Sequence, residues 1–208
     1  MLHVHKQRKR TARANARHQN GLTLVELLVT TGILLMVSSI TLAGYPEFAQ
    51  RLSLKRAAQE VALIYRRAQS FALAVREFQT QFPGYGVAVN LADSRQALVL
   101  FADFSLGGED FVGNLRYDGE ESGEKAEEFR LQSNITIARL CTNKQEDGSW
   151  ENCAHQTLEV VYTRPDPIIT LRADAETANI SNIGVTLATL RGVERTIVIW
   201  GTGQITIE

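Results

Sequence analysis

The chain has few of the residues on which enzymes most often depend. Among its 208 residues there are four histidines, and three of them, His3, His5 and His18, lie in the first 20 residues. It contains no P-loop, no Gly-x-Ser-x-Gly nucleophile elbow and no His-Glu-x-x-His pair. These absences exclude the common hydrolase and nucleotide-hydrolysing motifs. We therefore predict that the protein is not an enzyme, with no catalytic residues, no cofactor and no metal site.

The net charge is also small, −1 at pH 7, but it is unevenly distributed. The first 21 residues carry six Lys or Arg side chains and no acid, so the rest of the chain carries −7. A mildly acidic body argues against general nucleic-acid binding, which depends on phosphate neutralisation by Lys and Arg. Arg191 and Arg195 would form a small basic patch for an anionic partner such as DNA. Beside Glu194, they are more typical of a surface loop.

The chain has two cysteines, Cys141 and Cys153, which bracket the 11 polar residues TNKQEDGSWEN. In an exported domain, a disulfide that closes this loop is the natural interpretation. Such a closure stabilises a fold by roughly 2–4 kcal/mol in the chain-entropy model. The alternatives are two free thiols, or a metal or redox pair for which His155 is the one further ligand nearby.

The chain does contain one long hydrophobic run, from Leu22 to Tyr45. It has 24 residues and a single ionisable group, Glu26. About 20 apolar residues suffice for a helix to cross a bilayer. Since Lys and Arg flanking a membrane span stay on the cytoplasmic side, the N-terminus is expected inside and the residues after about Pro46 outside.

The start of this run carries a motif. An ordinary secretory signal places its cleavage site after the apolar core, whereas here the expected processing point, Gly21, precedes it. Residues 21–28, GLTLVELL, after a basic leader, resemble the prepilin cleavage and N-methylation motif of type IV pilins and type II secretion pseudopilins. The resemblance implies that an integral-membrane prepilin peptidase cuts after Gly21 and methylates the new amino group of Leu22. The first mature residue is leucine, where the family more often has phenylalanine.

The resemblance makes Glu26 the acidic residue of the family, and a physical reason for it can be given. Cleavage creates an α-amino cation at Leu22, and Glu26 follows one helical turn later. An opposite charge nearby offsets the cost of burying either group. In a helical filament the partner would be the amine of a neighbouring subunit. The alternative is that Glu26 only favours the dipole at the first turn of the helix.

The remaining pattern predicts an α+β fold. From residue 47 to about 79, apolar residues recur mostly every three or four positions with charged residues between them, as in an amphipathic helix. Pro46 should kink the helix or mark the membrane boundary. Short strands are then expected at 85–89, 97–102, 129–140, 157–162, 168–171, 184–190, 196–200 and 204–207, with residues 105–128 as an exposed excursion and a hairpin turn at 201–203. We thus expect a leader (1–21), a transmembrane and assembly helix (22–45), an amphipathic helix (46–82) and a β-rich head (83–208) in a pilin-like arrangement.

The chain resembles the GspH/FimT group of minor pseudopilins in three features. These are the sequence RRAQSFA at 66–72, the set of strands and the closing hairpin. The resemblance implies a structural subunit of a type IV pilus or type II secretion filament. Its partners would be other pilin subunits, the prepilin peptidase and the bacterial inner membrane, which it would span once with its head outside the cytoplasm. A membrane-tethered module that captures DNA or a secreted protein is the alternative, and a signal-anchored enzyme a third.

Overall fold

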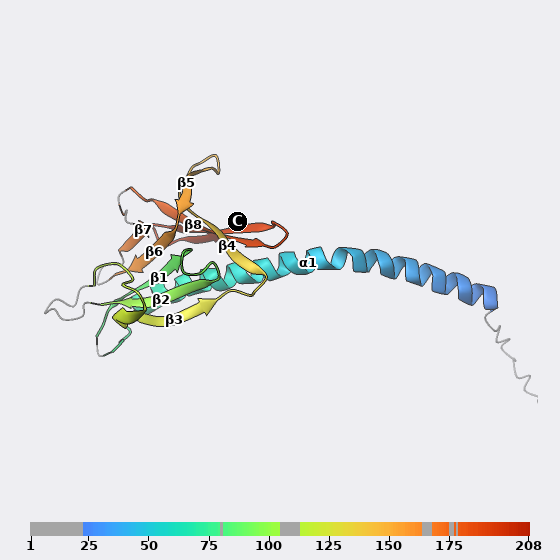
Figure 1. Cartoon of the computed structure of the whole chain (residues 1–208), viewed down its shortest axis with the longest axis horizontal. Helices are drawn as coiled ribbons and strands as arrows, with labels where there is room; N and C mark the ends of the chain where they lie inside the picture. Colours follow the sequence, from blue (N-terminus) through green and yellow to red (C-terminus); the bar gives the residue numbers. More distant parts are fainter. Residues whose placement is uncertain (1–22, 80, 105–112, 164–167, 175–176, 178) are drawn as a thin grey trace, which may run out of the picture. The chain divides into compact units, whose positions relative to one another are not determined.

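The computed structural model describes residues 23–79, 81–104, 113–163, 168–174, 177 and 179–208. One long helix, α1 (Leu24–Leu73), is followed by a short 3-10 helix (Glu120–Ser122) and by strands (Figure 1). The strands are β1 (Gly84–Asn90), β2 (Ala97–Asp103), β3 (Lys125–Arg130), β4 (Ile135–Lys144), β5 (Trp150–His155), β6 (Thr157–Tyr162), β7 (Ile169–Ala173), β8 (Asn182–Thr189), β9 (Glu194–Trp200) and β10 (Ile205–Ile207). The predicted α+β class, with a long N-terminal helix and antiparallel sheets, is confirmed.

The chain divides into two compact units between Tyr45 and Pro46. In the first unit, α1 carries exposed apolar side chains, and within the described residues it is the one helix long and apolar enough to cross a membrane. Its hydroxyl groups bond back to carbonyl oxygens of the preceding turn, as those of Thr30, Thr31, Ser39 and Thr41 do. These side chains therefore add no unpaired hydroxyl to the apolar surface.

The second unit, residues 46–208, is called the head below. It contains two antiparallel five-stranded sheets. The first has the order β3-β2-β1-β6-β7 and the second the order β10-β9-β8-β4-β5. The chain passes from the second sheet to the first through Gln156, the one residue between β5 and β6. Residues of α1 and of both sheets share a single hydrophobic core.

The face of α1 that enters this core consists mainly of small residues. Its fully or almost fully buried positions are Leu54, Ala57, Ala58, Val61, Ala62, Tyr65, Ala68 and Ala72. Alanines at this spacing allow the sheets to approach the helix closely. The apolar face predicted over residues 47 to about 79 is not buried throughout, because Phe48, Leu52 and Val75 are exposed.

The helix also ends at Leu73, earlier than the predicted end near Gln79. The Arg76 amide donates to the Phe71 carbonyl, and the Val75 amide donates to the Ala72 carbonyl. Val75 itself has a φ of 54°. This is a Schellman-type end, in which a left-handed residue closes the last turn. The position usually carries glycine, so a valine here provides no signal that the helix ends.

Val75→Gly is expected to stabilise the head by about 1 kcal/mol, because glycine adopts a positive φ without the steric cost that a β-branched residue has. The Val75 side chain is 47% exposed, so little buried apolar area is lost. Chemical denaturation of the two proteins measures the difference. Gly192→Val, at a φ of 77°, is the reverse change and should destabilise. An unaltered or lower stability of the Val75→Gly variant would contradict strain at this position.

Most strands lie where the sequence placed them, and two do not. β3 falls at the end of the acidic segment that was expected to be an exposed excursion, and β5 falls in the polar segment between the cysteines. Both are edge strands, and most of their side chains face solvent or are only partly covered. The turn at 201–203 is confirmed, since the Gly203 amide donates to the Trp200 carbonyl at 2.8 Å. Residues 164–167, Arg-Pro-Asp-Pro, predict a further turn, which lies outside the described residues.

Candidate functional site

The predicted processing residues Gly21 and Leu22 lie outside the described residues, whereas Glu26 is in the first turn of α1. The helix begins at Leu24, and the amide of Glu26 donates to Thr23 Oγ1 at 3.2 Å. Thr23 is therefore the N-cap. A threonine cap followed by glutamate three residues later is the sequence of a capping box. The Glu26 side chain is exposed in the isolated chain. The first turn is thus fixed by Thr23, which leaves the carboxylate of Glu26 available to a partner.

The surface that follows is apolar all round. Leu24 is 80% exposed and Leu42 is 70% exposed, and the large apolar side chains between them are all at least half exposed. From Leu24 to Tyr45 the helix is about 33 Å long, close to the ~30 Å hydrocarbon thickness of a bilayer. A helix with apolar side chains on all sides is stable only in lipid or against other apolar helices.

The structure joins Cys141 to Cys153 by a disulfide. Cys141 is buried on β4 and Cys153 is exposed on β5, so the bond ties an edge strand to its neighbour. Trp150, at the start of β5, packs on Gly184 of β8, where a Cβ atom would lie 2.4 Å from the indole ring. The disulfide and this ring contact together hold the outer hairpin of the second sheet.

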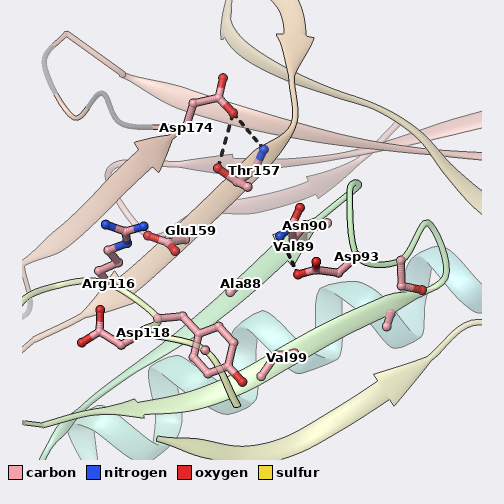
Figure 2. Close-up of a pocket in the computed structure, with 14 residues that line it drawn as sticks. Ala88, Val89, Asn90, Asp93, Val99, Arg116, Asp118, Thr157, Glu159 and Asp174 are labelled. Carbon is pink, nitrogen blue, oxygen red and sulfur yellow. Dashed lines mark hydrogen bonds between the residues drawn. The ribbon is translucent and has the colours of Figure 1, made fainter. Parts of the chain in front are cut away.

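A cavity of about 440 Å³ lies on the first sheet, over β1, β2 and β6. Figure 2 shows Arg116 and Asp118 on one side of it, with Glu159 of β6 near Arg116. Asp93 accepts a hydrogen bond from the Asn90 side chain at 2.6 Å at its other end. The lining thus presents both signs of charge. Sequence reasoning did not identify this cavity, because its residues come from four separate segments.

Glu159 is the most buried charged group in this lining, and its side chain is 12% exposed. Burial raises the pKa of its carboxyl group, and the backbone N–H of Tyr117 and the charge of Arg172 oppose that rise. The Nε atom of Arg172 lies 3.9 Å from Glu159 Oε2, which is too long for a hydrogen bond. This carboxylate is therefore only loosely compensated by its neighbours.

Two further buried carboxylates hold the segment 113–124 against the head. Asp103 accepts the Leu115 amide at 3.1 Å, and Glu124 accepts the Asp118 amide at 2.8 Å. Both side chains are about 1% exposed. Burial raises the pKa of Asp103 to about 6, and the charges of Glu124 and Asp118 add to the rise while the Leu115 amide opposes it. Burial likewise raises the pKa of Glu124.

The head is expected to become more stable as the pH falls from about 7.5 to 5. The folded-state pKa of Asp103, about 6, lies above its ordinary value of 3.8. Its contribution is therefore complete below pH 4 and is lost as the pH rises through 6, which corresponds to about 1 kcal/mol between pH 7.5 and 5. Denaturation curves at both pH values measure it. In Asp103→Asn, the gain on acidification should shrink; an equal gain would exclude Asp103 as its source.

A Thr–His–Asp series that sequence reasoning missed lies between the sheets. Thr142 Oγ1 is 3.0 Å from His155 Nε2, and His155 Nδ1 is 2.9 Å from Asp174 Oδ2. The order resembles a hydrolase triad. However, the Thr142 side chain is buried, and the amides of Gln156 and Thr157 also donate to Asp174. A hydroxyl that no substrate reaches serves packing, so we interpret the series as a polar link around the β5–β6 crossing.

The two arginines considered as a basic patch lie on the hairpin of β8 and β9. Arg191 is exposed in the turn after β8, and Arg195 is partly exposed on β9. Glu194 forms an ion pair with Arg139. No group of three His, Cys, Asp or Glu side chains that could hold a metal ion is found among the residues described.

Comparisons with known proteins bear on the N-terminus and on about two thirds of the chain. A family model of the prokaryotic N-terminal methylation motif matches residues 16–42. Two fimbrial proteins of Pseudomonas aeruginosa are each 27% identical to this chain over 143 residues, which are 65% of this chain and 84% of the relative. No solved structure matches. The match at 16–42 includes Gly21, Leu22 and Glu26.

Proposed function

We propose a processing and assembly role for this chain, on the premise that it is a subunit of the type IV pilin family, as the methylation motif and the fimbrial relatives support. The chain is made as a precursor with its basic leader in the cytoplasm. A prepilin peptidase cuts after Gly21 and methylates the amino group of Leu22. The helix then holds the mature protein in the inner membrane as a single span, with the head outside.

The observation that carries this proposal is the exposed apolar surface between Leu24 and Tyr45, most of which lies within residues 16–42, the match to the methylation-motif model. In an isolated chain this apolar surface is exposed to solvent. In the membrane, lipid covers it; in a filament, the same segments of neighbouring subunits do. Because apolar contact is equivalent in the two places, the transfer between them requires little net apolar energy. Other interactions must then favour the filament.

Glu26 supplies such an interaction in our proposal. Its carboxylate pairs with the Leu22 amine of the next subunit, so that two charges that are costly in an apolar medium compensate each other. A charge pair acts over a short distance and therefore also fixes the axial register between subunits. Thr23 already caps the helix, so Glu26 is not required for that task alone.

The test is the intact mass and N-terminal sequence of the protein isolated from its native cells. We expect a chain that begins at Leu22 and carries one methyl group on its amine. A protein that still begins at Met1, or one that begins beyond Tyr45, would overturn the proposal. Changing Gly21 to a bulkier residue should retain the leader, whereas a matched change at Gly32, within the apolar helix, should leave processing unaltered.

At a finer level, we propose a GspH/FimT-like minor subunit of a type II secretion or pilus filament. The features that favour this assignment are the sequence RRAQSFA at 66–72 and the closing hairpin of β9 and β10. Quantifying this chain against the most abundant subunit in purified filaments tests it. A minor subunit should be present at a small fraction of that abundance, and an equal amount would exclude the minor role.

A membrane-tethered binding module is the second candidate, and the cavity over β1, β2 and β6 is the observation that favours it. A chain that lacks residues 22–45 separates the two functions. Retained capture of DNA or of a secreted protein by that shortened chain would favour a binding module. Loss of all filament-related phenotype with no retained ligand would favour the assembly subunit.

A further inference from the structure

The turn between β8 and β9 contains a leucine whose side chain is exposed to solvent. Leu190 is 82% exposed, more than any other large apolar side chain of the described part of the head. The turn is nevertheless well defined. The Thr189 amide donates to the Val193 carbonyl at 3.0 Å, and the Gly192 amide donates to the Thr189 carbonyl at 2.9 Å. Leu190 is therefore presented to solvent by a closed turn.

This turn lies at the end of the head where the chain enters it. Thr189 pairs with Ile135 across β8 and β4. The nearby Gln132 accepts a hydrogen bond from the Ser53 hydroxyl of α1 at 2.9 Å. Ser53 is seven residues after Pro46, which is about 10 Å along a helix. If residues 22–45 span a membrane, only a short length of chain joins this end of the head to the membrane.

The charge next to Leu190 is positive. Arg191 is exposed in the same turn, and Arg195 follows on β9. Their acidic neighbour Glu194 forms its ion pair with Arg139. Within the described residues, neither Arg191 nor Arg195 forms an ion pair, so both guanidinium groups are available to an anionic partner. Leucine next to arginine suits the interface of a bilayer, where the apolar side chain enters the acyl boundary and the guanidinium remains at the phosphates.

We propose that the Leu190–Arg191 turn rests on the anionic headgroup surface of the membrane, as a second contact beside the transmembrane helix. The proposal rests on the membrane anchor of the proposed function. Before assembly, this contact limits the tilt of the head relative to the bilayer, because it fixes a point of the head that is distinct from its entry at Pro46. It is lost when the subunit leaves the membrane.

The test uses the full chain in lipid vesicles, with an environment-sensitive fluorophore on a single introduced cysteine. The native cysteines are joined to each other and do not react with the label. The test position is Leu190→Cys and the control is Leu73→Cys, which is 59% exposed but about 40 Å along α1 from Pro46. Vesicles are made of phosphatidylcholine alone or mixed with phosphatidylglycerol.

In the mixed vesicles, we expect a blue shift of the label at 190 and its quenching by a lipid with a spin label near the headgroup. The label at 73 should keep the emission it has in water. Adding Arg191→Glu to Leu190→Cys should reverse the shift, and phosphatidylcholine alone should reduce it. The proposal would be overturned if the label at 190 had the same emission in vesicles as the label at 73. It would also be overturned if the emission at 190 shifted only in filaments.

Vesicle flotation separates this proposal from the anchor on which it rests. If the full chain fails to float with vesicles, the anchor is wrong and the contact falls with it. If the chain floats but the label at 190 remains in water, the anchor stands and the contact is wrong.

Discussion

Replacing Glu26 by glutamine is expected to lower incorporation into filaments at least about tenfold, because the amine of the neighbouring subunit then lacks its counter-charge in an apolar setting. Glutamine is also accepted in a capping box, so the helix start that Thr23 fixes is preserved. Glu26→Val, which loses both charge and capping geometry, should behave similarly. Membrane insertion and processing after Gly21 should be intact in both variants. Quantitative immunoblotting of sheared filaments against whole cells measures the effect.

Thr23→Ala is the matched control for this result. It removes the hydroxyl that accepts the Glu26 amide and leaves the carboxylate in place. Losing an N-cap costs about 1 kcal/mol of helix stability, which the lipid environment of a long helix tolerates. We expect near-normal incorporation of this variant. Normal incorporation of Glu26→Gln would refute the charge pair, and a defect confined to Thr23→Ala and Glu26→Val would assign Glu26 to capping.

Replacing both Cys141 and Cys153 by alanine is expected to destabilise the head by about 3 kcal/mol, the chain-entropy value for a loop of this size. For a domain of this length, that corresponds to a fall in Tm of roughly 6–12 °C. The effect should be concentrated in β5, an edge strand that contributes few buried side chains. Thermal unfolding gives the total loss, and amide exchange across β5 gives its location.

Reduction provides the control. Dithiothreitol should lower the Tm of the unaltered protein to about that of the double variant and should leave the variant itself unchanged. A loss below about 1 kcal/mol would mean that the Trp150 contact with Gly184 and the β4–β5 hydrogen bonds hold the hairpin without the disulfide. In that case the cross-link has little structural role.

The sequence predicts the structure best where a single local pattern is strong. The helix over residues 24–45 is predictable because a long apolar run with a single acid can satisfy its backbone hydrogen bonds in lipid only as a helix. The hairpin at 201–203 is predictable because Gly203 has a φ of 89°, which glycine adopts at low cost. The two cysteines are joined across one hairpin. In each case the cause is local in the chain.

The features that the sequence did not reveal depend on contacts between distant residues. β3 reads as an acidic loop, but the antiparallel pairing of Leu98 with Phe129 places it beside β2. Asp103 and Leu115 come together only when the segment 113–124 folds back. The stop after Leu73 depends on Val75, a residue type that rarely adopts a positive φ, so no propensity argument could place the end of α1.

The chain passes between the sheets three times, and the crossing from β5 to β6 consists of the single residue Gln156, which has a mechanical consequence. The two sheets share their core with α1, and so short a crossing gives no slack for one sheet to separate from the other. We therefore expect the two sheets to unfold together, and not one after the other, when force is applied through α1.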